Sequence, residues 1–380
     1  MLSTTELWYR AKKAYSLYPG VGAPVSGSFL AAHYARRRAA RGPARALLDG
    51  LIGTAFLAWL PARARAVQRQ HRLDDSWAAR AVAIARQRFA DPNDIALFRI
   101  ETADQLDGYI RRFEDAGINQ RINPAAWTPD CVLADKIAFY ERCAAAGLPH
   151  PAVVATLRRG RWTTVEAAAG RPLLLKPARG EGGRGVRLLD TLEAAGTPRH
   201  DWLVQVRIAT HPALADLALN ALPTARITTI VGPDGPEVVS SVVRLPVDPA
   251  AVVDNMKAGG ILSPVDLDNG ALGVACKGYG GGDIDRHPVT GVAIPGRKLP
   301  DWAAAKALVT GAHARTFAEY SIIGWDVGFA PYGPVLIEGN GKPGVLMPQR
   351  AGRRGLGGQR YGELLAWHLA RLDGKQGRCR

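Results

Sequence analysis

The first part of the chain places apolar and basic residues with the spacing of helices. Alanine, leucine and arginine recur at intervals of three and four residues over 44–70 and again over 75–90, as in amphipathic helices. Another helix is predicted over 103–117, where Gly117 is a suitable C-terminal cap. The pattern therefore predicts a mainly helical region over residues 1–118.

From residue 130 onward the pattern changes to an alternation of strands and helices, which predicts an α/β (α+β) fold. Helices are expected over 131–147, 160–170, 211–222 and 300–320, and strands over 148–157 and 201–208. The remaining features are a strand–glycine loop–strand unit over 171–190, hairpins over 224–247 and 324–340, and a loop or lid over 252–298.

One apolar run, Ala46 to Leu60, invites comparison with a membrane span. It is shorter than the ~20 residues that a span needs, and it contains Asp49. One interpretation is a helix packed on the rest of the protein, in which case deleting residues 1–65 should leave it insoluble or inactive. The other is an interfacial helix whose flanking arginines meet anionic lipid. The flanking arginines are Arg41, Arg45, Arg63 and Arg65.

Composition sets broad limits on the class of protein. With 47% hydrophobic and 22% charged residues, the chain is expected to be globular. Its four cysteines show neither the number of a disulfide scaffold nor the spacing of a zinc site. Residues 1–20 lack the basic and apolar regions of a secretory signal, so a cytoplasmic location is expected.

The charge is unusual, because 49 basic residues face 34 acidic ones and give a net charge of +15. Only ten of the basic residues are lysines. A solvated arginine-rich surface explains this excess without any function. The alternative is a polyanionic partner, such as a nucleotide, a phosphorylated substrate, nucleic acid or anionic lipid.

A glycine loop follows the apolar strand that ends at Lys176. Its glycines allow backbone N–H groups to approach phosphates closely. Apolar residues follow the loop in a strand pattern, so the GxGxxG string is interpreted as a flap over phosphates rather than as a Rossmann turn. A lysine just before the loop adds a cation aimed at the same phosphates. The loop glycines are Gly180, Gly182, Gly183 and Gly185.

Two carboxylates are predicted to face each other in the hairpin over 324–340. If Pro331 to Gly333 forms a three-residue turn, Asp326 lies opposite Glu338, and Asn340 lies on the same sheet face. Opposed carboxylates repel unless a cation lies between them or arginines neutralise them. Oxygen ligands without His or Cys favour Mg²⁺, with Mn²⁺ as an alternative. Removing either carboxylate is expected to relieve repulsion and leave the fold intact.

These motifs together resemble the ATP-grasp superfamily, and more narrowly its sugar-transfer associated group. The resemblance covers residues 120–350 and rests on ordered motifs. It implies a helical region over 1–118, an ATP-grasp domain over 119–373 and a basic tail over 374–380. Within the domain, subdomains over about 130–203 and 204–350 would grip ATP. The motifs are LADKIAFYERCAAAGLPHP, LLLKPARGEGGRGV, VQVRIATHPALADLALNALPTARITT, DNMKAGG and GWDVGFAPYGPVLIEGN.

The resemblance also implies roles for individual residues. Lys136 and Lys176 would hold the α- and β-phosphates under the glycine loop. The strand containing Val204, Gln205 and Val206 would offer backbone groups to adenine. The remaining roles concern catalysis and metal binding. Arg226 and Arg244 would face the γ-phosphate and the acyl phosphate, and Asp326, Glu338 and Asn340 would bind two Mg²⁺ ions.

The expected activity is an ATP- and Mg²⁺-dependent carboxylate–amine ligase that forms an amide through an acyl phosphate. Its substrates would be a small carboxylate, which is an amino acid, a peptide or a sugar-linked acid, and an amine. The resemblance associates this activity with polysaccharide biosynthesis. A kinase of the same fold is one alternative, and a basic module that binds nucleic acid or a membrane surface is another. Only 7% of the residues are aromatic, which argues against nucleic acid.

Overall fold

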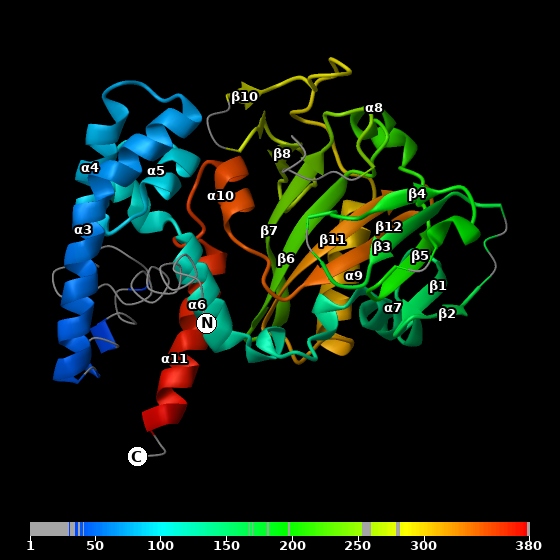
Figure 1. Ribbon diagram of the computed structural model, residues 1–380, viewed down its shortest axis with the longest axis horizontal. Helices are drawn as coiled ribbons and strands as arrows, with labels where there is room; N and C mark the ends of the chain where they lie inside the picture. The colour runs from blue at the N-terminus through cyan, green and yellow to red at the C-terminus, as the bar shows by residue number, and fades with distance from the viewer. Residues whose placement is uncertain are drawn as a thin grey trace. The chain divides into compact units, whose positions relative to one another are not determined.

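Figure 1 shows the computed structural model of the chain, which divides into two compact units. The first unit comprises Met1–Ile122, Gly278–Gly281 and Gly344–Arg380, and the second comprises Asn123–Lys277 and Gly282–Pro343. The domain limits predicted from the sequence, 1–118, 119–373 and 374–380, remain predictions. The residues that the structure describes are 30, 35–36, 39–40, 42–166, 168, 170–180, 182–196, 198–252, 260–278 and 282–377.

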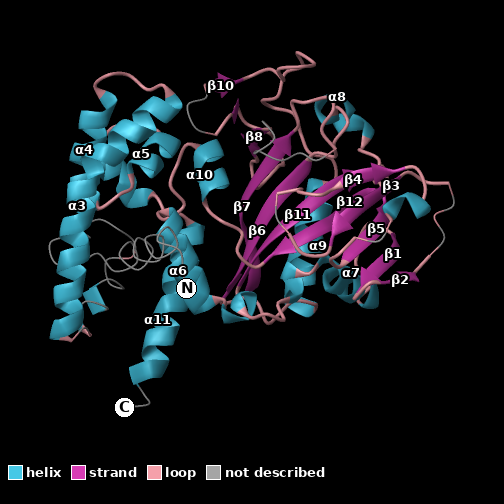
Figure 2. Ribbon diagram, in the orientation of Figure 1, coloured by secondary structure: helices cyan, strands magenta, loops and turns pink. Residues whose placement is uncertain are grey.

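The first unit is helical, as the residue pattern predicts, and Figure 2 draws its labelled elements as helices. Its core contains Trp77 and Ile84 of the second helix, together with Ile95 and Phe98 of the third. The helices are α3 (Pro43–His71), α4 (Trp77–Arg88), α5 (Pro92–Phe98), η1 (Ala103–Gly108), α6 (Arg112–Ile122), α10 (Leu346–Gly352) and α11 (Arg360–Gly377).

Helix α3 contains the long apolar run and uses it in two ways. Phe56 and Leu60 are buried in the core of the first unit. Leu47 and Leu51 are exposed, so the packed interpretation describes only the second half of the run. No helix in the described part of the chain combines the length and apolar character that a bilayer span requires.

The second unit contains two antiparallel sheets, which Figure 2 shows in magenta. The five-stranded sheet has the order β2-β1-β5-β3-β4, and the seven-stranded sheet has the order β10-β9-β8-β7-β6-β11-β12. The first sheet consists of β1 (Val153–Arg158), β2 (Arg161–Thr164), β3 (Leu173–Pro177), β4 (Arg187–Leu189) and β5 (Trp202–Val206). The second consists of β6 (Thr224–Gly232), β7 (Gly235–Leu245), β8 (Ile261–Pro264), β9 (Ala275–Cys276), β10 (Asp283–Ile284), β11 (Ile322–Ala330) and β12 (Gly333–Asn340).

One face of the seven-stranded sheet forms the main core of this unit. Ile227, Trp325 and Val327 share this core with Ala305 and Val309 of the covering helix α9. Because side chains alternate along a strand, the residues between them lie on the other face. The helical elements of the unit are η2 (Pro124–Trp127), η3 (Val132–Ala134), α7 (Lys136–Ala145), η4 (Glu193–Ala195), η5 (Pro212–Leu214), α8 (Ala215–Ala218) and α9 (Trp302–Arg315).

Several elements differ from those predicted. The expected helix over 160–170 is instead strand β2, which pairs with β1. The helix expected over 211–222 is reduced to η5 and the four-residue α8. The segment 252–298, expected to be a loop or lid, contributes strands β8 to β10 to the sheet edge. Local residue preferences did not predict these strands, because the strands depend on backbone hydrogen bonds to neighbouring strands.

A buried hydrogen-bond chain joins α9 to the core face of β11. Trp325 Nε1 donates to Thr229 Oγ1 at 2.8 Å, and Thr229 Oγ1 lies 2.7 Å from His313 Nδ1. His313 Nε2 lies 2.9 Å from the carbonyl oxygen of Tyr320. Since a carbonyl only accepts, a neutral His313 protonated on Nε2 satisfies every atom in this chain.

This histidine predicts how stability depends on pH. Burial lowers the pKa of His313 from 6.5 to about 4. Between these values the unfolded chain binds the proton and the folded chain does not, so stability falls as pH drops. We expect His313 to account for a loss of about 3 kcal/mol between pH 6.5 and 4. Urea unfolding should show a shallower pH dependence for His313→Gln, whereas exposed His200→Gln should keep the wild-type dependence.

Candidate active site

A polar strip lies on the face of the seven-stranded sheet opposite its apolar core. The register pairs Asp326 with Arg226 on β6, and it pairs Thr224 with Arg244 across β6 and β7. Since Ile227 and Trp325 belong to the core face, alternation directs Arg226 and Asp326 to the other face. The strip therefore brings together residues that are far apart in the sequence.

Asp326 does lie opposite Glu338, as predicted, but the turn between them differs. Ala330 pairs with Gly333, so the turn contains two residues rather than three. A bulge between Asp326 and Val327 then shifts the register by one residue and restores the Asp326–Glu338 pair. The prediction of a three-residue turn was wrong, and the extra residue is instead accommodated within β12.

Asp326 is neutralised by two arginines in this structure. Arg226 donates to it through Nε at 2.5 Å and Nη2 at 3.2 Å, and Arg244 Nη2 lies 2.8 Å from Oδ2. Arg226 also donates to the carbonyl oxygen of Pro343. A side chain at Gly324 would place Cβ 2.5 Å from Pro343 Cβ, so glycine leaves room for this segment. The arginine alternative considered for opposed carboxylates is thus realised for Asp326.

The environment of Asp326 favours its charged form. Burial alone would raise the pKa of this carboxyl group. The guanidinium groups of Arg226 and Arg244 outweigh burial and hold the pKa well below its ordinary range. Asp326 therefore remains an anion at every pH at which the protein would normally be studied.

Lys136 connects the second carboxylate to the glycine loop. Its Nζ donates to the carbonyl oxygen of Gly180 at 3.0 Å and lies 3.5 Å from Glu338 Oε1. Glu338 is the more accessible of the two carboxylates, with 26% of its side chain exposed against 7% for Asp326. Separating Lys136 from Glu338 therefore costs less free energy than separating Arg226 from Asp326. A more highly charged anion can draw Lys136 away from Glu338.

The glycine loop has the predicted strand–loop–strand form. Strand β3 pairs with β4 through Leu173–Leu189 and Leu175–Arg187. Gly182, Gly183 and Gly185 have φ values of 70°, 68° and 79°, which favour glycine over other residues. The loop is therefore a hairpin flap, and the GxGxxG string does not begin a helix.

A pocket opens between the two sheets and adjoins the polar strip. Its cavity volume is about 80 Å³, smaller than the ~300–1,000 Å³ of typical small-ligand sites, and the pocket opens to solvent. Thr224 belongs to both sites, since it lines the pocket and accepts a hydrogen bond from Arg244. Lys176 and Gln205 also line the pocket.

Strand β5 reaches this pocket through a side chain. It lies between β1 and β3, so its backbone groups are engaged on both edges. Val204 and Val206 pack in the apolar core of the five-stranded sheet. Gln205 lines the pocket and is 1% exposed, and its Oε1 has no hydrogen-bond partner among the residues that the structure describes. The geometry therefore favours the Gln205 side chain over the strand backbone as a ligand contact.

Other sequence candidates have local explanations. His211 caps η5, because its Nδ1 accepts from the N–H of Ala213. Asp216 pairs with Arg297. Most of the DNMKAGG motif, residues 254–259, lies outside the described residues. Among the described residues, no cluster of three or more His, Cys, Asp or Glu side chains has metal-site geometry.

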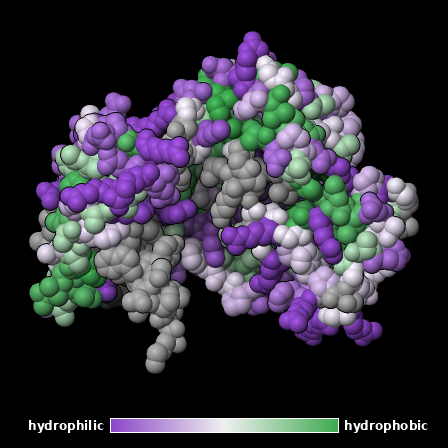
Figure 3. Space-filling model, turned by 45° about the horizontal axis from the view of Figure 1, so that its top comes forward, coloured by the Kyte–Doolittle hydropathy of each residue, from purple (hydrophilic) through white to green (hydrophobic). Residues whose placement is uncertain are grey.

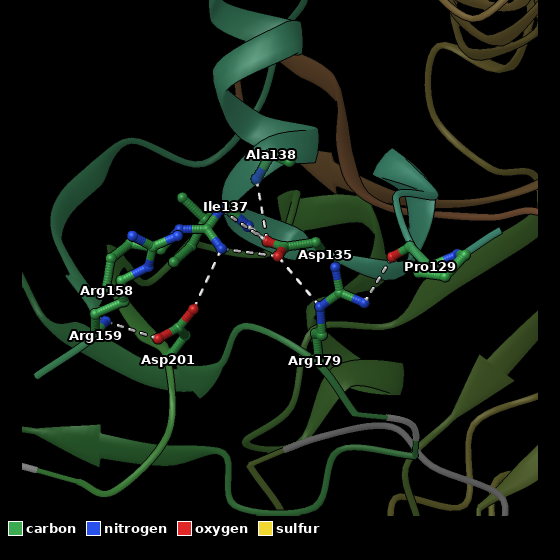
Figure 4. Close-up of polar contacts among 8 residues, drawn as sticks. All are labelled: Pro129, Asp135, Ile137, Ala138, Arg158, Arg159, Arg179 and Asp201. Carbon is green, nitrogen blue, oxygen red and sulfur yellow. Dashed lines mark hydrogen bonds and ion pairs between the residues drawn. The ribbon is translucent and has the colours of Figure 1, made fainter.

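Asp135 is a site residue that the sequence analysis missed. Its carboxylate caps α7 by accepting from the N–H groups of Ile137 and Ala138. Figure 4 shows it between Arg158 and Arg179, with Arg158 Nη1 at 2.8 Å and Arg179 Nε at 3.4 Å. Arg179 directly precedes the glycine loop, and Lys136 directly follows Asp135. An Asp before a helical run is a known capping signal, but its arginine partners could not be inferred from it.

Burial and charge act in opposite directions on Asp135. Burial raises the pKa of its carboxyl group, but the hydrogen bonds from Arg158 and Ala138 and the nearby positive charges of Arg158 and Arg179 outweigh burial and lower the pKa overall. Replacing it with asparagine keeps the capping oxygen and removes the charge that holds both arginines. We expect Asp135→Asn to lose about 1–2 kcal/mol and trypsin to cleave faster after Arg184 in the loop.

The control separates capping from charge. Asp135→Ala should lose about a further 1 kcal/mol, the usual worth of a cap. Urea unfolding measures the first effect, and mass spectrometry of tryptic fragments measures the second. Wild-type cleavage rates in Asp135→Asn would contradict a role for Asp135 in holding the loop.

Comparison with known proteins shows a family similarity over part of the chain. Residues 187–361 match the model of the sugar-transfer associated ATP-grasp family. This segment contains the arginines and carboxylates of the polar strip, but Lys136, Lys176 and the glycine loop precede it. A search of curated proteins gave no match.

Three solved structures illustrate what the fold is similar to. D-alanine–D-alanine ligase from Bacillus anthracis complexed with ATP is 12% identical, with a TM-score of 0.38 over 65% of this chain and 69% of that one. D-alanyl-alanine synthetase A from Vibrio cholerae is 13% identical, with a TM-score of 0.40 over 65% and 66%. L-amino acid ligase from Bacillus licheniformis is 14% identical, with a TM-score of 0.33 over 55% and 40%. Residues 187–361 of this chain are therefore similar to the sugar-transfer associated ATP-grasp family.

Proposed function

We propose that this protein is an ATP-dependent ligase that joins a carboxylate to an amine. The observation that carries the proposal is the polar strip, in which Arg226, Arg244 and Lys136 surround two opposed carboxylates beside a pocket. Phosphoryl transfer depends mainly on positioning and charge neutralisation, and this strip supplies both. The match of residues 187–361 to an ATP-grasp family model supports ATP as the phosphoryl donor.

The pocket would hold the adenine of ATP, and the glycine loop would cover its phosphates. Gln205 Oε1, which no described residue contacts through a hydrogen bond, can accept from the exocyclic amine of adenine, since a buried acceptor without a donor is costly. Lys176 lines the same pocket and is 9% exposed, which strengthens its attraction to phosphate. Lys136 would move from Glu338 to a phosphate oxygen as the loop closes.

The charge balance of the strip supports this order of events. Three cations, Arg226, Arg244 and Lys136, accompany two carboxylates, Asp326 and Glu338. The strip is therefore positive and attracts a polyphosphate before it attracts a metal ion. Once phosphates take over the cations, the carboxylate oxygens become available.

The donor set at this position fits Mg²⁺. Asp326 and Glu338 offer carboxylate oxygens, and Asn340 lies beyond Glu338 with a buried Nδ2 that has no partner in the described part of the chain. Oxygen ligands suit Mg²⁺ and also Mn²⁺. When bound, the metal would neutralise phosphate oxygens, and these three residues would hold it.

The arginines are placed for the chemistry itself. A substrate carboxylate oxygen forms a bond to the γ-phosphorus, and ADP leaves. An amine then attacks the acyl carbon, and phosphate leaves with its electron pair while the amine loses a proton. Arg226 and Arg244 would hold the γ-phosphate and stabilise the negative oxygen of the tetrahedral intermediate, in the manner of an oxyanion site.

A phosphate-release screen tests this proposal. The protein is incubated with Mg-ATP and pairs drawn from amino acids, peptides and uronic-acid sugars, and product mass is measured. A ligase releases ADP and free phosphate in equal amounts, and only when both substrates are present. Transfer of the phosphoryl group to a product without free phosphate would instead identify a kinase. No binding of Mg-ATP by calorimetry would overturn the assignment.

A further inference from the structure

Helix α3 has an outward face without charge over several turns. Leu47 is 68% exposed, Leu51 is 62% and Leu48 is 44%. Between Arg45 and Arg65, none of the exposed α3 residues is charged. They are Leu47, Leu48, Leu51, Thr54, Ala55, Ala58 and Ala62. Figure 3 shows hydrophobic side chains gathered at the lower left, where Figure 1 draws the beginning of α3.

This outward face is not needed to pack the helix. Phe56, Leu60, Ala64 and Val67 already bury the opposite side of α3 in the core of the first unit. The outward residues repeat every three or four positions, so they form one continuous stripe. At 1.5 Å per residue, the stripe over 47–62 is about 22 Å long. Apolar surface of this extent marks an interaction site when it is contiguous.

The charges around the stripe indicate its partner. Arg45 lies near the beginning of the stripe, and exposed Arg65 and Arg69 continue the same helix face at its end. Helices that lie in a membrane interface combine an apolar face with basic residues beside it. Each arginine near an anionic surface contributes about 1 kcal/mol to binding. The net charge of +15 adds attraction at longer range.

We propose that the outward face of α3 docks this protein on an anionic lipid surface, with the helix lying in the interface rather than crossing it. A second copy of the chain fits less well, because a stripe one helix wide buries less area than stable interfaces need. Pairing two copies would also bring their arginines together. Lipid has neither restriction, since it adapts to a narrow apolar stripe and supplies the negative charge.

Vesicle sedimentation tests this inference without any enzyme assay. Full-length protein is mixed with phosphatidylcholine vesicles that contain either no anionic lipid or 30% phosphatidylglycerol by design, roughly a cell-like surface charge. We expect binding to the anionic vesicles to be at least tenfold tighter. Leu47→Ser with Leu51→Ser should lose at least tenfold. Arg65→Gln with Arg69→Gln should lose about thirtyfold, the equivalent of about 2 kcal/mol.

The controls use the exposure of these residues. All four side chains are on the surface, so circular dichroism and urea unfolding should match the wild type. Val165 is 61% exposed in the second unit, and Val165→Ser should keep wild-type vesicle binding. Equal binding by the leucine variant and the wild type would overturn the proposal. So would a dimer, seen by sedimentation equilibrium without lipid, that the leucine substitutions dissociate.

Discussion

Asp326→Ala is expected to destabilise the fold by about 3–5 kcal/mol, the usual cost of removing one member of a buried ion pair. The sequence alone indicated the opposite, because removal of one of two opposed carboxylates should relieve repulsion. In the structure Asp326 instead neutralises Arg226 and Arg244, which would be left with uncompensated buried charge. Urea unfolding of the variant and the wild type measures this difference directly.

Acid provides a second measure of the same interaction. The arginines hold the pKa of Asp326 below its ordinary value, so its stabilising effect is complete above about pH 4 to 5. It disappears as pH falls toward the folded-state pKa. The difference in unfolding free energy between wild type and Asp326→Ala should therefore shrink below about pH 4. A difference that stayed constant through this range would contradict the ion-pair explanation.

Glu338→Gln is expected to reduce ATP turnover by two or more orders of magnitude with little change in stability. Its side chain is 26% exposed and its lysine partner is 3.5 Å away, so the pair contributes about 1 kcal/mol or less. Under the proposed function, however, it loses a carboxylate that would hold Mg²⁺. Coupled assay of ADP release and urea unfolding, run on the same preparation, separates the two effects.

A matched control variant tests whether loss of any surface carboxylate reduces turnover. Glu319 pairs with Arg142 on the surface and is 43% exposed, so Glu319→Gln should keep wild-type turnover. Turnover by Glu338→Gln within threefold of the wild type would remove Glu338 from the proposed site. Weaker binding of Mg-ATP with an unchanged maximal rate would place Glu338 in nucleotide binding alone.

The opposed carboxylates could be predicted because strand alternation and hairpin pairing are local. The sequence also predicted the strand–loop–strand form of the glycine loop, because Val186, Leu188 and Leu189 follow it with strand composition. The turn between β11 and β12 was predicted one residue too long. Two departures, a shorter turn and a bulge near Ile337, then cancelled at Asp326. Bulges depend on tertiary packing, so the pattern of residues along a strand rarely predicts their position.

The neutralising partners could not be predicted, since they are distant in sequence. Arg226 and Asp326 are separated by 100 positions, and the chain offers 39 arginines as candidates. The cluster around Asp135 shows the same limit. Its capping role is local and has a sequence signal, whereas its contacts with Arg158 and Arg179 exist only once three segments meet. Long-range ion pairs of this kind require the fold itself.

The two faces of β11 restrict how the gene can change in length. Asp326 lies between Trp325 and Val327, which belong to the apolar core. Inserting or deleting one residue within the strand would exchange the faces beyond that point, placing an indole in the polar strip or a carboxylate among apolar side chains. The hairpin tip, where Tyr332 is 74% exposed, has no such restriction. Insertions in this part of the gene should therefore survive selection only at Pro331 and Tyr332.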